Sequence, residues 1–184
     1  MIEEFRRSVT GYDDNGDAVF VRQEVVPPVE TLLYPGATYW KVWGTEDGIP
    51  VVGRDDPQVD SPHFPGPGGS RIVITKFAPN TAAGAGASRH SEHELAAMRA
   101  DAETKFPGLF DAHAAEENAA FHTSDTFDYA FVLDGELVLE LDNGVTEQLS
   151  TGSIVVQRGT RHAWRNESDK PTLVIFVLLG AHRV

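Results

Sequence analysis

The sequence contains no cysteine and few basic residues. Without cysteine the chain forms no disulfide and offers no thiolate, so a metal ligand would have to be an imidazole, a carboxylate, a hydroxyl or water. Lys and Arg number 15 against 28 Asp and Glu, which gives a formal net charge of -13. Nucleic acids and anionic membranes bind positively charged surfaces, so this charge predicts that neither is a partner.

Long hydrophobic runs are missing as well. No stretch of about 18 consecutive apolar residues is present, and the first residues have no apolar signal-peptide core, so we expect a cytoplasmic protein. The 184 residues, 41% of them hydrophobic, suit one domain. We divide it into N-terminal strands forming an arm (1–45), a loop (46–70), a strand with a helical insertion (71–120) and a C-terminal core (121–180).

The N-terminal segment has the pattern of a β-hairpin. Two β-favouring stretches, 5–10 and 18–26, flank Asn15-Gly16, a pair that suits a type I′ turn. A further strand is predicted at 38–43. The loop that follows is dense in proline and glycine, which predicts a surface excursion containing a solvated His63. The alternative is a functional or subunit-bridging loop.

One helix is predicted at residues 91–106. Ser91 and Glu94 have the spacing of a capping box. Leu95, Met98, Ala102 and Phe106 follow on one helical face. His90 and His93 flank the helix start beside two glutamates; acidic residues favour that end of a helix for dipole reasons, so we do not interpret this cluster as a metal site.

The C-terminal half consists of short β-favouring stretches separated by glycine-containing turns. This spacing is typical of a β-sandwich or β-barrel. The predicted strands are 127–133, 136–142, 145–149, 153–157, 162–165 and 172–178.

Two parts of this half resemble the signature motifs of the cupin superfamily. In the first motif, His122 matches the first histidine and Gly135 the final glycine, whereas Ser124 stands at the second histidine and Asp128 at the glutamate. In the second motif the matching residues are Gly152, Gly159, His162 and Asn166. The pattern is most similar to an uncharacterised bacterial subgroup of cupin-2 proteins, which in turn resembles cupins of aromatic polyketide pathways.

The resemblance implies an all-β fold, a single jelly-roll cupin β-barrel with an N-terminal hairpin arm and one short helical insertion. It also implies a homodimer, because small cupins often dimerise through such arms. Function is less constrained than fold, since one fold hosts many activities.

Strand periodicity predicts where the reactive groups meet. His122 and Asp128 have the same parity, and if the barrel closes with that face inward they converge with His162. Two imidazoles and a carboxylate suit a divalent metal ion, Fe above all, with Zn, Mn, Ni or Cu as alternatives. Without a metal, His162 and Asp128 would be the catalytic acid and base.

The substrate pocket is predicted to be small and largely apolar, which suits a small organic, possibly aromatic, substrate. Its predicted lining residues are Ser124, Ala130, Val132, Gln157 and Trp164. Three functions remain open: a metal-dependent oxygenase or isomerase, a metal-free acid–base enzyme, and a non-catalytic small-molecule binding protein.

Overall fold

The computed structural model describes residues 2, 4–52, 58–80, 91–114 and 120–184. Its N-terminal half contains β1 (Arg6–Tyr12), β2 (Ala18–Val25), β3 (Pro28–Val29), β4 (Thr38–Thr45), β5 (Ser70–Phe77), α1 (Glu92–Lys105) and α2 (Leu109–Ala114). The C-terminal half contains β6 (Thr126–Asp134), β7 (Glu136–Glu140), a 3₁₀ turn (Asp142–Gly144), β8 (Thr146–Ser150), β9 (Ile154–Arg158), β10 (Ala163–Arg165) and β11 (Thr172–Gly180). The predicted all-β jelly-roll class is confirmed.

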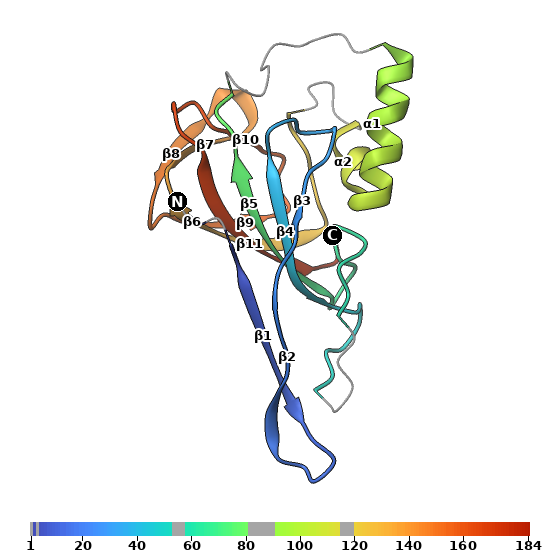
Figure 1. Ribbon diagram of the computed structural model, residues 1–184. Coiled ribbons are helices and arrows are strands. Elements are labelled where there is room, and N and C mark those ends of the chain that lie inside the picture. Colours follow the sequence, from blue (N-terminus) through green and yellow to red (C-terminus); the bar gives the residue numbers. More distant parts are fainter. Residues whose placement is uncertain (1, 3, 53–57, 81–90, 115–119) are drawn as a thin grey trace.

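Two antiparallel sheets form the barrel (Figure 1). The larger sheet has the strand order β3-β4-β5-β11-β6-β9, and the smaller one has the order β10-β7-β8. Strand β11, the last of the chain, lies between β5 and β6 and therefore joins the N-terminal strands to the cupin-motif strands. The position of β11 therefore places strands from both halves of the sequence around one barrel interior.

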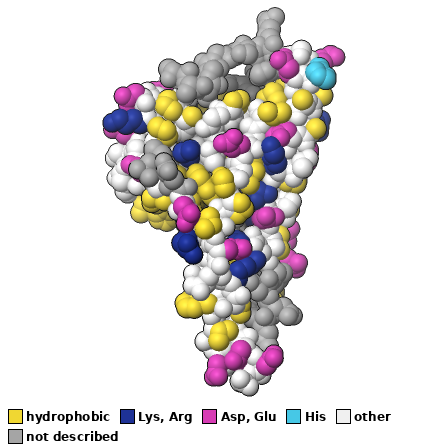
Figure 2. All heavy atoms as spheres, in the orientation of Figure 1, with side chains coloured by type: hydrophobic (Ala, Val, Ile, Leu, Met, Phe, Trp, Pro, Cys, Tyr) yellow, Lys and Arg dark blue, Asp and Glu magenta, His cyan; other side chains and the backbone are white. Residues whose placement is uncertain are grey.

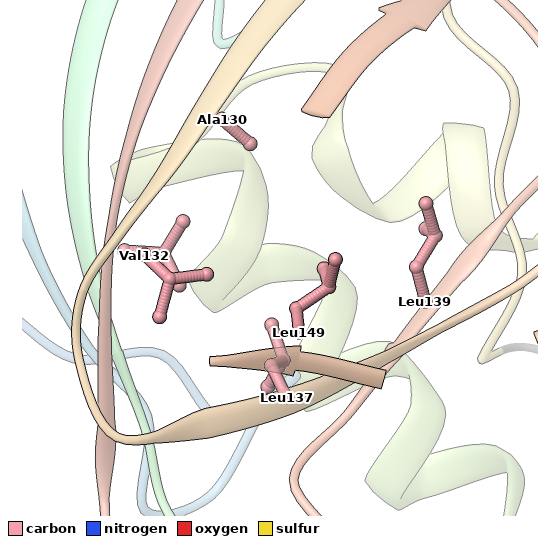
Figure 3. Close-up of a cluster of buried hydrophobic side chains, with 6 residues drawn as sticks. Ala130, Val132, Leu137, Leu139 and Leu149 are labelled. Carbon is pink, nitrogen blue, oxygen red and sulfur yellow. The ribbon is translucent and has the colours of Figure 1, made fainter. Parts of the chain in front are cut away.

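Apolar side chains fill part of the barrel interior. Ala130 and Val132 of β6 pack with three leucines of the smaller sheet (Figure 3) and with Val174 of β11. The alternation along β6 places these residues on the same face as Asp128, because side chains two apart in a strand point the same way. The polar site therefore lies beside a packed apolar layer.

The N-terminal hairpin extends away from the barrel as an arm (Figure 1). Its turn differs from the predicted type I′ geometry, which needs positive φ at both central residues. Only Gly16 has positive φ (88°), and the loop closes instead through Asp13, whose Oδ1 accepts hydrogen bonds from the N–H groups of Asn15 and Asp17. Hydrophobic side chains stand exposed along the arm (Figure 2), and Phe20 is 64% exposed.

The helical insertion packs against the larger sheet. Its predicted cap is confirmed: the Ser91 hydroxyl accepts from the Glu94 N–H, and the Glu94 carboxylate accepts from the Ser91 N–H. Phe106, at the C-terminal end of α1, is buried against Tyr39 of β4. The short helix α2 was not predicted. Neither described helix is long and apolar enough to cross a membrane.

Candidate functional site

A cavity of about 440 Å³ opens between the inner face of the larger sheet, the motif strands and the helical insertion. Its described walls are mostly aromatic and aliphatic, and they contain no Lys or Arg. The ionisable or hydrogen-bonding side chains on the wall include four histidines, one carboxylate and two tyrosines: His63, His113, His122, His162, Asp128, Tyr34 and Tyr39. His122, Asp128 and His162, which were predicted to converge, all line this cavity.

His122 and His162 are joined by their main chains. They form an isolated antiparallel bridge, in which each N–H donates to the other's carbonyl, at 3.0 and 3.1 Å. Their ring centroids are 4.3 Å apart. The bridge holds the first histidine of the first motif beside the histidine of the second, and its bonds do not involve the imidazole nitrogens.

The turn before His162 fixes the orientation of its ring. Nδ1 lies 2.9 Å from the Thr160 carbonyl, so this nitrogen carries the proton and Nε2 keeps its lone pair. The Gln157 amide donates to the same carbonyl, at 3.1 Å. Gly159 has a φ of 62°, and a Cβ there would lie 2.8 Å from the Ser124 carbonyl oxygen, so the turn requires glycine. This part of the motif orients His162.

Asp128 is a buried carboxyl that is only partly hydrogen-bonded. It is 5% exposed, and within the described chain its Oδ1 has no hydrogen-bond partner. Burial raises its pKa to about 6, and a hydrogen bond from the Thr126 hydroxyl opposes that rise. The Ser124 hydroxyl lies 2.7 Å from that of Thr126, so Ser124 reaches Asp128 through a hydroxyl pair. Near neutral pH the carboxyl can both take and give a proton.

Both motif imidazoles are held neutral. Burial is the largest cause of the lowered pKa of His122, which falls to about 2, and the neighbouring His162 lowers it further. Burial likewise lowers the pKa of His162, against the Thr160 hydrogen bond. Nδ1 of His122 is buried with no partner among the described residues. A buried nitrogen left unpaired costs free energy, so a ligand that bonds to it would be favoured.

The side chains of His122, Asp128 and His162 are of the types that bind divalent ions. In the described structure, however, they are not already arranged as a metal-binding group. Two neutral imidazoles and a carboxylate, two of them with unsatisfied buried atoms, are ligands that iron or zinc accepts. The hydrogen bond from His162 Nδ1 resembles the outer support that orients metal-binding imidazoles. Yet, over the described ranges, no three His, Asp or Glu side chains form a group that could hold a metal ion.

His63 lies on the cavity wall, so the prediction that it is solvated was wrong. The His63 ring packs edge-on against Phe64 and Phe106. The main-chain N–H of His63 donates to the Pro107 carbonyl, at 3.0 Å. Burial lowers its pKa to about 3. Arg71 holds the loop in place, donating to the carbonyls of Ser61 and Pro62. The loop is thus part of the cavity, although residues 53–57 lie outside the described chain.

The pair formed by His113 and Tyr34 was not predicted. His113 belongs to α2, its Nε2 is 2.6 Å from the Tyr34 hydroxyl, and its ring centroid is 4.4 Å from that of His122. No motif or spacing in the sequence marks His113; the available signal was only that histidine is scarce. The chain has seven, and four of them line this cavity.

The predicted pocket residues are distributed differently from what strand parity suggested. Trp164 lines the cavity and packs edge-on against His162. Ala130 and Val132 are not lining residues, because they belong to the packed apolar layer. Ser124 and Gln157 are buried behind the wall, where they bond to Thr126 and Thr160. His93 is exposed at the start of α1, and His90 lies outside the described residues, so the prediction for that cluster stays untested.

Comparison with known families matches less than half of the chain. Residues 109–178 match the family model described as Cupin domain (Cupin_2). This match agrees with the resemblance that the two motifs indicated, and the matched segment also includes α2 and His113.

Curated relatives match this chain over short spans. The Phomopsin biosynthesis cluster protein C′ of Diaporthe leptostromiformis is 51% identical over 61 residues, which cover 33% of this chain and 32% of the relative. The cupin-domain-containing oxidoreductase srdD of Neurospora crassa is 36% identical over 66 residues, 34% of each chain. The match thus spans about a third of these relatives' length. Both organisms are fungi, and the likeness to a bacterial subgroup stays a prediction.

Solved structures with similarity to this chain include two that cover most of it. The Cnp3 cupin domain of Schizosaccharomyces pombe has a TM-score of 0.46 at 7% identity, over 98% of this chain and 89% of that one. The polyketide cyclase RemF of Streptomyces resistomycificus has a TM-score of 0.43 at 15% identity, over 83% of this chain and 72% of that one.

Proposed function

We propose that the chain is an enzyme that binds a small, uncharged and largely aromatic molecule in its cavity and acts on it through His122, Asp128 and His162. The supporting observation is that these three side chains line the same cavity while His122 Nδ1 and Asp128 Oδ1 lack partners within the described chain. Unsatisfied buried polar atoms are costly in a resting fold, and they cluster at sites where a ligand completes them.

The walls of the cavity support the substrate class. Phe64, Phe77, Trp164 and Phe176 contribute aromatic surface. The described lining has no Lys or Arg to balance a carboxylate or phosphate, so an anionic substrate would lose its hydration without a compensating cation. An uncharged ring system avoids that cost.

Proton transfer is the chemistry that the chain's own residues provide. His162 presents a lone pair at Nε2, because Nδ1 donates to Thr160, and can take a proton from a bound substrate. Asp128, with a pKa of about 6, can return one as its acid form or act as a base once ionised. The largely apolar walls provide a low-dielectric surrounding that strengthens the hydrogen bonds made to a bound ligand.

A more specific form of this proposal includes a divalent metal ion. His122, Asp128 and His162 would hold it, and the ion would polarise a substrate oxygen or support oxygen chemistry. Three of the relatives, from Neurospora crassa, Aspergillus ruber and Hypocrea virens, are named cupin-domain-containing oxidoreductases, which supports a redox activity. Elemental analysis of untagged protein tests this: about one equivalent of metal per chain, lost in His122→Ala, supports it, and none after reconstitution opposes it.

The second candidate is a metal-free isomerase or cyclase. It is favoured by the raised pKa of Asp128 and by the fact that, in the part of the chain that the structure describes, no three-residue metal-binding group is preformed. It predicts turnover that survives a chelator. A non-catalytic binding protein is the remaining alternative, and recovery of every bound ligand unchanged would support it.

Conversion is tested directly with a library of uncharged phenols and aryl ketones. Wild-type protein and His162→Asn are incubated with the library and with air, and products are sought by mass spectrometry. A product formed by the wild type alone supports the proposal. Unchanged recovery of a ligand shown to occupy the cavity would move the function to binding.

We further propose that the protein is a cytoplasmic homodimer that binds neither nucleic acid nor membrane. The negative charge supports the two exclusions. The exposed side chains of Val19, Phe20 and Val21 on the arm support self-association, because apolar side chains exposed on a projecting hairpin can be covered by a partner.

A further inference from the structure

Tyr34 and His113 form a hydrogen-bonded pair on the cavity wall, outside both cupin motifs. Tyr34 lies between β3 and β4, and His113 lies in α2 of the helical insertion. Tyr34 Oη and His113 Nε2 are 2.6 Å apart, and both residues line the cavity. His113 is 5% exposed and also contacts the His122 ring. The pair therefore adjoins the reactive set but is supplied by different segments.

The direction of this hydrogen bond follows from the tyrosine's single proton. Among the described residues, His113 Nε2 is the one hydrogen-bond partner of the Tyr34 hydroxyl. We assign the hydroxyl as the donor to His113 Nε2, because its proton would otherwise be unpaired in a buried site. The oxygen of this cavity-lining tyrosine can then only accept a hydrogen bond from a ligand.

Burial keeps Tyr34 in this form. It raises the pKa of the phenol well above its usual value, so the residue remains a neutral hydroxyl at physiological pH. A neutral acceptor inside an apolar cavity selects for a ligand group that donates a hydrogen bond. A ligand without such a donor leaves the oxygen unsatisfied and loses that free energy.

We infer that Tyr34, oriented by His113, accepts a hydrogen bond from the substrate's hydroxyl group, and that the substrate is an uncharged aromatic alcohol or phenol. This deepens the proposed function and rests on it, because it takes the cavity as the substrate site. The aromatic walls contact the ring system of the substrate, and Tyr34, oriented by His113, accepts the hydrogen bond from the substrate's hydroxyl. His122, Asp128 and His162 then act on a substrate whose hydroxyl is bound by Tyr34, from the segment between β3 and β4.

Three naphthalene probes of matched size test the inference. They are 2-naphthol, its ether 2-methoxynaphthalene, which cannot donate, and 2-naphthoate, which is anionic. Dissociation constants are measured by isothermal titration calorimetry at neutral pH. For the wild type we expect 2-naphthol to bind about tenfold more tightly than the ether, the value of one net hydrogen bond, and 2-naphthoate to bind more weakly than 2-naphthol.

Removing single hydroxyls locates the effect. Tyr34→Phe should reduce the preference for 2-naphthol over the ether to about twofold or less, mainly by weakening 2-naphthol. Tyr39→Phe is the matched control, because Tyr39 is also a buried tyrosine on the cavity wall. It should keep the full preference. Unfolding midpoints of both variants show whether the fold is retained.

His113→Phe provides an independent variant that leaves Tyr34 in place. It removes the acceptor that orients the Tyr34 hydroxyl, which is then free to donate, so the preference for 2-naphthol over the ether should fall. An unchanged preference in either Tyr34→Phe or His113→Phe would overturn the inference, as would equal losses in Tyr34→Phe and Tyr39→Phe.

The same probes separate this inference from the proposed function. Wild-type protein that binds naphthol and ether equally overturns the role of the pair while leaving the cavity as a ligand site. A Tyr34-dependent preference with no conversion of any bound ligand supports the pair and opposes enzymatic function. Wild-type protein that binds none of the probes overturns the inference and removes the cavity-binding basis of the proposal.

Discussion

The main chains of His122 and His162 hydrogen-bond to each other in both directions. The bridge positions both imidazoles, yet its bonds involve only N–H and carbonyl groups. A side-chain substitution at either position therefore leaves the bridge intact. This separation makes the site suitable for mutation, because loss of chemistry can be distinguished from loss of fold.

His162→Asn tests the role of Nε2. The asparagine amide can still donate to the Thr160 carbonyl, as Nδ1 does, while the Nε2 lone pair is removed. We expect conversion of substrate to fall by about a hundredfold or more, which is the range for loss of a general base. The unfolding midpoint should stay close to that of the wild type; a stable variant with full activity would contradict the assignment.

The buried imidazole of His63 predicts a pH dependence of stability. Its pKa is lowered from 6.5 to about 3 in the folded state, mainly by burial. The unfolded chain therefore binds more protons, so the stability contributed by neutral His63 is present above pH 6.5 and is lost as the pH falls toward 3. Between pH 4 and 6 its contribution to the unfolding free energy should fall by about 1.4 kcal/mol per pH unit.

His63→Phe isolates this contribution. Phenylalanine keeps an aromatic ring against Phe64 and Phe106 but does not titrate. Denaturant unfolding at several pH values should give a shallower acid slope for the variant, by about one proton. Parallel slopes for the wild type and the variant would show that His63 is not held neutral by the fold.

Arg71 should control the position of the cavity loop. It is 2% exposed, and its guanidinium donates to four backbone carbonyls, including those of Ser61 and Pro62. A lysine ammonium cannot reproduce the planar, divergent N–H donors of the guanidinium. We expect Arg71→Lys to lower the unfolding free energy by roughly 3 kcal/mol.

Hydrogen exchange gives a local test of the same change. The His63 N–H is bonded to the Pro107 carbonyl and should lose protection in Arg71→Lys. Arg6→Lys, on the exposed side of β1, is the matched control and should change neither quantity. Retained protection at His63 would show that the loop is held by other contacts.

The arm predicts the oligomeric state. Phe20→Asp places a charge within the exposed apolar surface of the hairpin. Light scattering should give about twice the 20.1 kDa chain mass for the wild type and the single-chain mass for the variant. Val145→Asp, at another exposed hydrophobic position, should leave the dimer unchanged. A monomeric wild type would end the dimer proposal.

Strand pattern and turn chemistry were sufficient to predict the strands, and the resemblance to cupins predicted that they form a barrel. Short β-favouring stretches, with glycines at positive φ between several of them, gave β6 to β11 within one or two residues. The capping box gave the start of α1. The hairpin was predicted, but its turn was not, because Asp13 bonds to its own loop and competes with the Asn-Gly turn.

The site was predictable only where a motif encodes it. His122, Asp128 and His162 were predicted from the cupin-like motifs and strand parity, and all three line the cavity. His63 and His113 come from a loop and a short helix, whose placement depends on long-range contacts with Arg71, Phe106 and Tyr34. Parity shows that Ala130 faces inward, but only packing shows whether an inward residue meets the cavity or the apolar layer.

The most direct measurement of the central claim is the side-chain ¹⁵N spectrum of the histidines as 2-naphthol is added. Signals are assigned with variants in which one histidine at a time is replaced. The account predicts that the resonances of His122 and His162 shift together with one affinity, and that the exposed His93 and His182 do not shift. Shifts confined to the exposed histidines, or none at saturating ligand, would contradict the claim that this cavity is the functional site.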